Sequence, residues 1–222
     1  MTAETALQPI AIDIVSDVMC PWCFIGKRRL ERALPLLDGL AVDIRWRPFQ
    51  LDPTLPPEGL DRRQYLEAKF GGGERARAIY DNITAAGAAE DIPFDFRAIK
   101  VSPNTLDAHC LIRWSANVGA QDAVVEALFS AYFTEGRNIG DHAVLIDIAE
   151  KAGMDGDLVA ELLARGADHD LVREEIMLAQ RLGIDGVPCF IIANAVAIAG
   201  AHDPETLARA IREMAERGAT TA

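Results

Sequence analysis

The hydrophobic positions near the start of the chain predict a strand followed directly by a helix. Residues Pro9–Val15 are apolar and rich in β-branched side chains, with Asp13 as an isolated acid, which is typical of a buried strand. Pro21 suits the first turn of a helix. An apolar stripe at helical spacing follows it: Leu30, Ala33, Leu34 and Leu37. We therefore expect a helix over Cys20–Leu37.

A second strand is predicted over Ala41–Phe49, where apolar and polar residues alternate. A strand, a helix and a second strand in this order imply a parallel pair of strands. The segment Leu51–Gly59 then holds three prolines and a glycine. Because such a segment interrupts regular structure, we expect a domain boundary within it.

The periodic segments in the middle of the chain all have helical spacing. The predicted helices span residues 61–70, 73–88, 104–118, 122–133, 141–151, 156–164 and 168–182. After them the pattern predicts two short strands, Pro188–Ala193 and Val196–Ala199, joined by a turn near Asn194. A last helix begins at Asp203. Strands from both ends of the chain must share one sheet, because a lone two-stranded piece is marginal in water.

Composition and charge narrow the classes of function. Half of the residues are apolar, which is enough for one good core, and the net charge is −12 without any run of Lys or Arg. Such a surface repels phosphate backbones, so a nucleic-acid partner is not expected. No stretch approaches the roughly 20 apolar residues that span a bilayer, and the first nine residues lack the pattern of a signal peptide. We therefore expect a cytoplasmic protein without a membrane partner.

Cys20 and Cys23 are the candidate catalytic residues. Two cysteines separated by two residues at the start of a helix lie about one turn apart, so their sulfurs can form a reversible disulfide. Cys20 faces the free N–H groups at the helix start, and we expect this to lower its pKa and to make it the nucleophile. Cys23 lies one turn deeper and suits a resolving thiol that attacks the mixed disulfide between Cys20 and its substrate.

The same pair is open to two other interpretations, a structural zinc site and simple core packing. A zinc site would need two further ligands, which Cys110 and Cys189 would supply. Neither of them belongs to a second closely spaced pair, and we expect both to be core residues. Cys189 would act as a third redox partner only if it lay near the dithiol. We predict no metal site.

Asp13 and the four histidines are less decisive candidates. Asp13 either moves protons for Cys23 or lies at a solvent-facing edge of the sheet. The histidines have the spacing of neither a metal site nor a Cys–His dyad, so surface or helix-terminal positions are expected. They are His109, His142, His169 and His202.

Several separate segments carry a family resemblance. They are Asp17–Cys23 (DVMCPWC), Ile25–Leu30 (IGKRRL), Arg47–Leu51 (RPFQL), Ser102–Thr105 (SPNT) and Gly186–Pro188 (GVP). With them the chain resembles the DsbA-like proteins of the thioredoxin superfamily, and within that group the FrnE-like branch. The resemblance covers nearly the whole chain. It implies an α/β, thioredoxin-like fold in which residues 1–56 and 167–222 form one domain and residues 57–166 form an all-helical insertion.

The resemblance also implies a site and an activity. Pro188 is expected in the cis form beside the dithiol, with Val187 offering backbone hydrogen bonds to an extended substrate and with Pro21 and Trp22 contacting it. The simpler alternative is that Pro188 only begins a strand. The implied activity is thiol–disulfide exchange with a polypeptide or a small thiol, without a bound cofactor, and with glutathione as a possible redox partner. Cys189 departs from the family pattern, which has an aromatic or aliphatic residue there.

Two other classes of function stay open. Glutathione-dependent isomerases and transferases of the 2-hydroxychromene-2-carboxylate isomerase and kappa types resemble the same architecture. They usually carry serine at the position of Cys20 and lack the second cysteine, so the dithiol weighs against this class. A chaperone-like binding module would use an apolar groove of the helical block, and the sequence shows no exposed apolar stripe long enough to favour it.

Overall fold

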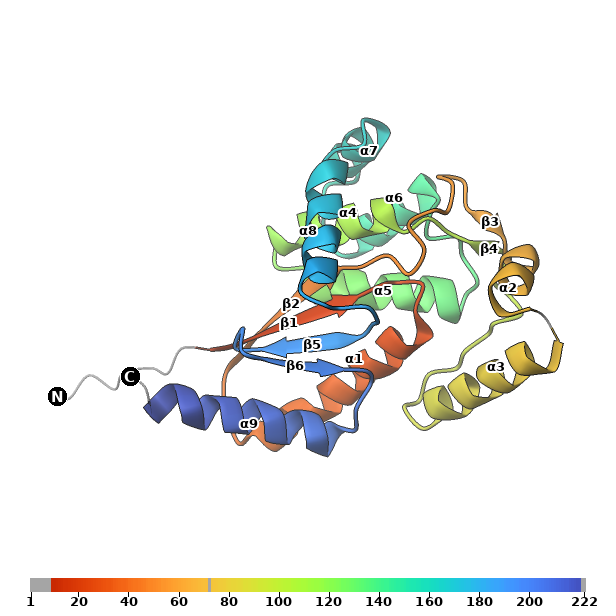
Figure 1. Cartoon of the computed structure of the whole chain (residues 1–222). Coiled ribbons are helices and arrows are strands. Elements are labelled where there is room, and N and C mark those ends of the chain that lie inside the picture. The colour runs from red at the N-terminus through yellow and green to blue at the C-terminus, as the bar shows by residue number, and fades with distance from the viewer. Residues whose placement is uncertain (1–8, 72, 221–222) are drawn as a thin grey trace.

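The computed structural model describes residues 9–71 and 73–220, and a mixed four-stranded sheet lies at its centre (Figure 1). The strands are β1 (Ile10–Ser16), β2 (Val42–Pro48), β5 (Cys189–Ile192) and β6 (Val196–Ala199), in the spatial order β2-β1-β5-β6. β1 runs parallel to β2, and β5 is antiparallel to both of its neighbours. As expected from the sequence, strands from the two ends of the chain meet in one sheet.

The two faces of this sheet are covered by different helices. Ile12 and Ile14 face the main core, to which α1 (Pro21–Ala33) and α9 (Pro204–Thr220) contribute their buried sides. Val15, from the alternate position, points to the opposite face and belongs to a small separate cluster with α8 (His169–Arg181). The alternation of side chains along β1 therefore assigns each residue to one of two distinct environments.

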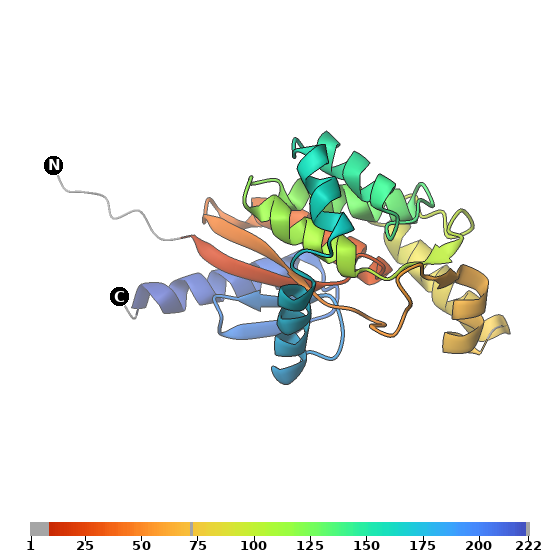
Figure 2. The same cartoon turned by 90° about the horizontal axis from the view of Figure 1, so that it is seen from above.

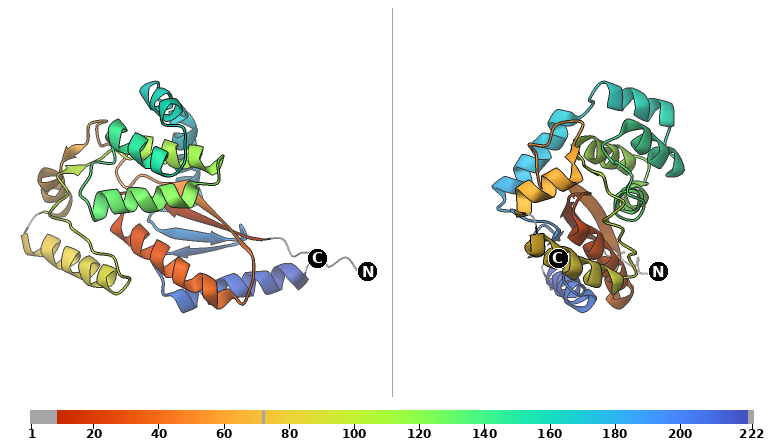
Figure 3. Two further views of the ribbon diagram at one scale, coloured as in Figure 1. Left: turned by 180° about the vertical axis from the view of Figure 1, so that it is seen from behind. Right: turned by 90° about the vertical axis from the view of Figure 1, so that its right-hand side faces the viewer.

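Within the described residues, six helices lie between β2 and α8 in the sequence, and Figures 2 and 3 show them in orange-yellow to teal. They are α2 (Arg62–Phe70), α3 (Gly73–Ala88), α4 (Leu106–Ala116), α5 (Gln121–Phe133), α6 (His142–Lys151) and α7 (Gly156–Ala164). Phe24 of α1 stacks on Phe129 of α5 with ring centroids 5.0 Å apart, and Trp46 of β2 meets Phe129 edge to face at 6.3 Å. Aromatic contacts thus join the inserted helices to the sheet in one continuous core. The domain boundaries near residues 56 and 166 stay a prediction.

The structure corrects the sequence expectations in three places. The first helix is α-helical only to Ala33, and Leu34–Leu37 form a 3₁₀ turn, because Pro35 lacks the N–H that a longer α-helix needs. A two-residue ladder, β3 (Leu60–Asp61) with β4 (Val101–Ser102), lies within the region predicted as helical. Two residues carry no periodicity, so this ladder has no sequence signal.

The third correction concerns Asp13. β1 is an inner strand, so the expectation of a solvent-facing edge is wrong. The carboxylate of Asp13 is buried and accepts a hydrogen bond of 2.6 Å from Arg47 Nε. Side chains alternate along β1, so Asp13 points to the α8 face and Ser16 points to the opposite face, which is the face that Cys23 contacts.

No helix in the described part of the chain combines the length and the apolar character that a membrane crossing requires.

The four-residue strands β5 and β6 form the predicted hairpin, whose turn contains Ala193 and Asn194 with φ of 52° and 54°. Asparagine tolerates this left-handed conformation better than alanine does.

Candidate active site

The site is built at the start of α1. Cys20 is the N-cap residue, with φ −94° and ψ 114°, and Pro21 occupies the first helical turn. The Cys20 N–H donates to Asp17 O at 2.9 Å, and the Cys23 N–H donates to Cys20 O at 3.0 Å. This turn puts Cys20 at the end of the helix where unpaired N–H groups and the helix dipole favour negative charge.

The loop before β5 lies directly against Cys20. The Cys20 thiol donates a hydrogen bond to Val187 O at 3.6 Å, and the Val187–Pro188 peptide bond is cis, as the resemblance implied. A Cβ atom at Gly26 would lie 2.9 Å from Pro188 Cγ, which is closer than side chains approach. The absence of a side chain at Gly26 therefore allows Pro188 to pack on α1 beside the dithiol.

Cys23 lies behind Cys20 and is 1% exposed. Burial raises the pKa of the Cys23 thiol well above its ordinary value, and the neighbouring Cys20 sulfur raises this pKa further, through a hydrogen bond and through the repulsion that two thiolates would have. The Ser16 hydroxyl and the Asp17 N–H act in the opposite direction, because both lie where they would donate hydrogen bonds to a Cys23 thiolate. Cys23 therefore holds its proton in the resting site, next to groups that can stabilise its anion.

Pro21 and Trp22 lie between the two cysteines in the chain, and both are half-buried. Trp22 packs against the edge of the main core. The structure thus brings together all the residues predicted for the site, and their roles in catalysis and substrate binding stay predictions.

Cys110 and Cys189 lie apart from the dithiol. Cys110 is fully buried in α4, where burial raises the pKa of its thiol to about 12. Cys189 points to the α8 face with Val15, Phe49 and Ala179, and burial raises its pKa as well. Within the described residues no group of three His, Cys, Asp or Glu side chains is placed to hold a metal ion.

Sequence reasoning missed three polar residues that hold the loop after β2 beside the dithiol, of which Asp17 and His109 are buried and Asn104 is partly buried. Asp17 accepts a hydrogen bond from Leu51 N–H at 2.7 Å, and Asn104 Nδ2 donates to Leu55 O at 2.7 Å. His109 Nε2 lies 2.8 Å from Phe49 O. This loop contains the prolines that predicted irregular structure, and side chains from two other segments replace the hydrogen bonds that a regular element would supply.

For His109 the expected surface position is wrong, because this residue lies in the first turn of α4 and is buried. It is 3% exposed, whereas His142 and His169 lie nearer the surface and share the carboxylate of Asp107 at 3.1 and 2.6 Å. A signal was present: α4 is apolar on nearly all sides, which is typical of a helix buried all round, so a histidine within it is buried too.

Comparison with known proteins places this geometry in a family. A family model described as a DSBA-like thioredoxin domain matches residues 11–212. The chain belongs to this family. The expected fold, α/β and thioredoxin-like with a large helical insertion, is thereby confirmed, and the family is one of thiol oxidoreductases.

Three relatives illustrate how the DSBA-like fold recurs. The crystal structure of the probable DsbA oxidoreductase SCO1869 from Streptomyces coelicolor is 33% identical, with a TM-score of 0.83 over 92% of this chain and 89% of that chain. The Bacillus subtilis protein YwbO is 27% identical over 92% of this chain and 96% of its own length. A 2-hydroxychromene-2-carboxylate isomerase is 16% identical, with a TM-score of 0.71 over 96% of this chain and 99% of that chain, and shares the fold alone. The FrnE-like branch stays a prediction.

Proposed function

We propose that the chain is a disulfide oxidoreductase in which Cys20 and Cys23 form a reversible disulfide. The contact of the Cys20 thiol with Val187 O, at 3.6 Å and beside cis Pro188, carries this proposal. It sets the thiol at a helix start against a loop that a substrate can reach. A second thiol, Cys23, is hydrogen-bonded to Cys20 from behind. This arrangement suits an attacking thiol and a resolving thiol.

The exchange proceeds in two steps. The Cys20 thiolate attacks one sulfur of a substrate disulfide, which forms a mixed disulfide and releases the other substrate sulfur as a thiolate. The Cys23 thiolate then attacks the Cys20 sulfur, which forms the Cys20–Cys23 disulfide and releases the second substrate thiolate. Two electrons pass from the protein dithiol to the substrate disulfide, and the reverse sequence oxidises a substrate dithiol.

The substrate site extends along Val187. Within the described residues no acceptor is hydrogen-bonded to the Val187 N–H, so this group is free to pair with an extended polypeptide. Pro21 and Trp22, half-buried in the first turn of α1 next to Cys20, would contact the same substrate. Main-chain pairing makes few demands on sequence, which fits polypeptides and small thiol peptides such as glutathione. The cytoplasmic location stays a prediction.

Three variants test the proposal. Cys20→Ser should lose thiol–disulfide exchange with a polypeptide disulfide, whereas Cys23→Ser should accumulate a mixed disulfide on Cys20 that mass spectrometry of the intact protein detects. Cys189→Ala is the control, because this thiol lies on the other face of the sheet, and it should keep the exchange. Exchange that survives Cys20→Ser would contradict the proposal.

The same variants test the glutathione-dependent isomerase or transferase. That activity predicts glutathione binding, measured by calorimetry, that is unchanged by Cys20→Ser. The disulfide oxidoreductase predicts instead that glutathione affects the wild type mainly through mixed disulfides. Equilibration in glutathione buffers then gives the reduction potential: a value near about −270 mV indicates a reductant, and a value near about −120 mV an oxidant.

A further inference from the structure

Cys23 must lose a proton during the proposed exchange, and it has no direct contact with bulk water. Its thiol is 1% exposed, and its burial stabilises the protonated form. In the second step the sulfur can attack only as a thiolate. A neighbouring group must therefore take the proton while the substrate is still bonded to Cys20 in the mixed disulfide.

Ser16 is the first group behind Cys23. Its side chain is 4% exposed and interacts with the Cys23 sulfur. Within the described residues, Ser16 Oγ is the buried side-chain oxygen or nitrogen without a regular hydrogen-bond partner. A buried hydroxyl without such a partner is costly, so its persistence calls for an explanation.

A small cavity on the far side of Ser16 offers that explanation. It has a volume of about 10 Å³ and is bordered by Ser16, Val18, Trp46, Arg47, His109, Ile112 and Val125. About 10–15 Å³ is the space that a single water molecule needs. Ser16, Arg47 and His109 are the polar residues on its border, and the other four residues are apolar or aromatic.

His109 has one ring nitrogen fixed and the other available. Nε2 lies 2.8 Å from Phe49 O and 3.5 Å from Asp17 Oδ1. Both neighbours are acceptors, so Nε2 carries the proton in the neutral ring and Nδ1 is the basic nitrogen. Nδ1 has no hydrogen-bond partner among the described residues and, as the unprotonated nitrogen of the ring, can accept a proton.

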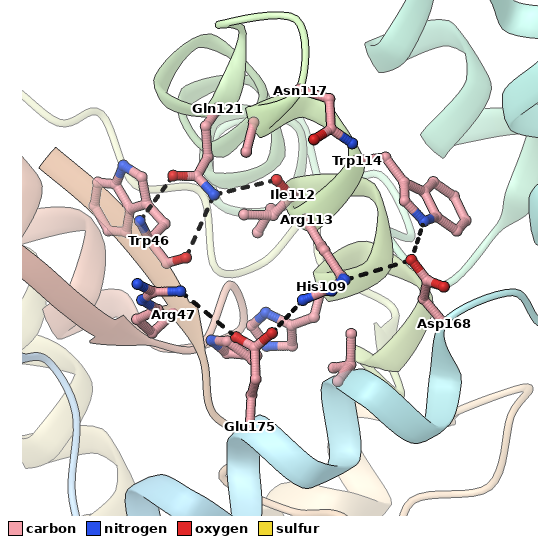
Figure 4. Close-up of a pocket in the computed structure, with 13 residues that line it drawn as sticks. Trp46, Arg47, His109, Ile112, Arg113, Trp114, Asn117, Gln121, Asp168 and Glu175 are labelled. Carbon is pink, nitrogen blue, oxygen red and sulfur yellow. Dashed lines mark hydrogen bonds and ion pairs between the residues drawn. The ribbon is translucent and has the colours of Figure 1, made fainter.

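A larger pocket continues from His109 to the surface. It has a volume of about 270 Å³ and shares Trp46, Arg47, His109 and Ile112 with the small cavity. Figure 4 shows Glu175 reaching toward Arg47 and Arg113 in this pocket, with His109 beside them. The charged groups around His109 are Asp17 after β1, Arg47 of β2, Arg113 of α4, and Asp168 and Glu175 at α8.

We propose that Cys23 exchanges its proton with solvent through Ser16, one water molecule in the small cavity, and His109. This proposal rests on the proposed function and adds a proton route to it. The Cys23 S–H donates to Ser16 Oγ, the Ser16 proton passes to the water, and a water proton passes to His109 Nδ1. The Nδ1 proton then passes to solvent in the larger pocket, which His109 also borders, while Nε2 keeps its proton on Phe49 O. No electrons move along this route. The electron pair of the Cys20–substrate bond leaves with the substrate sulfur.

The reaction with 5,5′-dithiobis(2-nitrobenzoate), which releases two thionitrobenzoate ions one after the other, separates this route from the dithiol chemistry. Attack by Cys20 releases the first thionitrobenzoate, and attack by Cys23 on the mixed disulfide releases the second. Ser16→Ala removes the relay hydroxyl. His109→Gln keeps an N–H for Phe49 O but cannot take up a proton. Both should slow the second release at neutral pH by about tenfold or more, the low end for lost acid–base catalysis, and leave the first release unchanged.

The pH profile distinguishes a proton route from a structural role. In both variants the second release should recover toward the wild-type rate as pH rises, because hydroxide then replaces the relay. Ser115→Ala is the matched control: this buried serine donates to Ile112 O in α4, away from Cys23, and both phases should match the wild type. A second phase unaffected in Ser16→Ala and His109→Gln overturns the relay alone. A wild type without a second phase overturns the proposed function itself.

Discussion

The two faces of the central sheet each bury a cysteine, in surroundings that differ. On the α1 face, Cys23 has three polar neighbours: the Cys20 sulfur, the Ser16 hydroxyl and the Asp17 N–H. On the α8 face, Cys189 has apolar neighbours, and burial alone raises its pKa. Burial protects both thiols from reaction. Only Cys23 also has groups that can stabilise its thiolate, and this difference separates a redox thiol from a packing residue.

The two faces also differ in the size of the apolar core that packs against them. The α1 face belongs to a core that runs from the sheet through Phe24 to the inserted helices, with aromatic rings in contact throughout. The α8 face has a small cluster of four buried residues, Val15, Phe49, Ala179 and Cys189, and also carries the ion pair between Asp13 and Arg47. We therefore expect the α1 face to dominate stability and the α8 face to tolerate change.

The largest expected effect is a loss of stability, and it compares two phenylalanines, one in the main core and one in the small cluster on the α8 face. Phe129→Ala should cost about 3–5 kcal/mol of unfolding free energy, because Phe129 is fully buried and contacts three other rings. Phe49→Ala in the small cluster should cost less by at least about 1 kcal/mol, since a thin cluster can close over the space. Denaturant unfolding measures both, and equal losses would contradict the difference in core size.

Gly26→Val probes the contact between α1 and the Pro188 loop. The new side chain would collide with Pro188 Cγ at 2.9 Å and with Phe190 Cζ at 3.3 Å. We expect overpacking to cost about 1–3 kcal/mol, and thiol–disulfide exchange to fall because the loop moves away from Cys20. Gly186→Ala is the control in the same loop, since a Cβ there meets no atom within 4 Å. Normal exchange in Gly26→Val would show that this packing is dispensable.

The sequence predicted the sheet, the main helices and the dithiol because each has a local signal. Alternation marks β2, helical spacing marks α1, and the spacing of Cys20 and Cys23 at a predicted helix start favours a redox dithiol. The loop around Pro188 was reached through family resemblance, because no local pattern joins it to a helix more than 150 residues earlier.

The second layer of the site was not predicted, because it depends on contacts between distant segments. Ser16 and His109 are 93 positions apart, and only the packing of α4 against the end of the sheet brings both to one cavity. The predicted edge position of Asp13 was wrong for a related reason. Whether β1 is an edge or an inner strand depends on which strand pairs on its other side, and β5 supplies that strand from the far end of the chain.

A third buried thiol, Cys110, extends the comparison to the inserted helices. Its pKa is raised to about 12, first by burial, so the folded protein keeps this proton at pH values where the unfolded chain, near about 8.5, has lost it. The unfolding free energy should therefore fall as pH rises above about 8.5, by up to about 1.4 kcal/mol per pH unit for this one proton.

Cys110→Ala should remove this part of the alkaline slope while adding a constant cavity cost. Denaturant unfolding of the reduced protein between about pH 8 and 10 measures the difference in slope between the variant and the wild type. Identical slopes would mean that Cys110 ionises alike in the folded and unfolded chains.

The ion pair on the α8 face should have the smallest effect. Arg47 Nε lies 2.6 Å from Asp13, whose side chain is 9% exposed, while the Arg47 side chain is 42% exposed. Solvent screens an arginine this open, so Arg47→Gln should cost no more than about 1 kcal/mol, with less loss at high salt. Arg45→Gln, which removes an exposed pair with Asp43 on the same strand, is the control and should cost still less. A loss of about 3 kcal/mol or more for Arg47→Gln would show instead that Asp13 behaves as a buried charge that needs its partner, and that the α8 face contributes to stability through this carboxylate rather than through its apolar cluster.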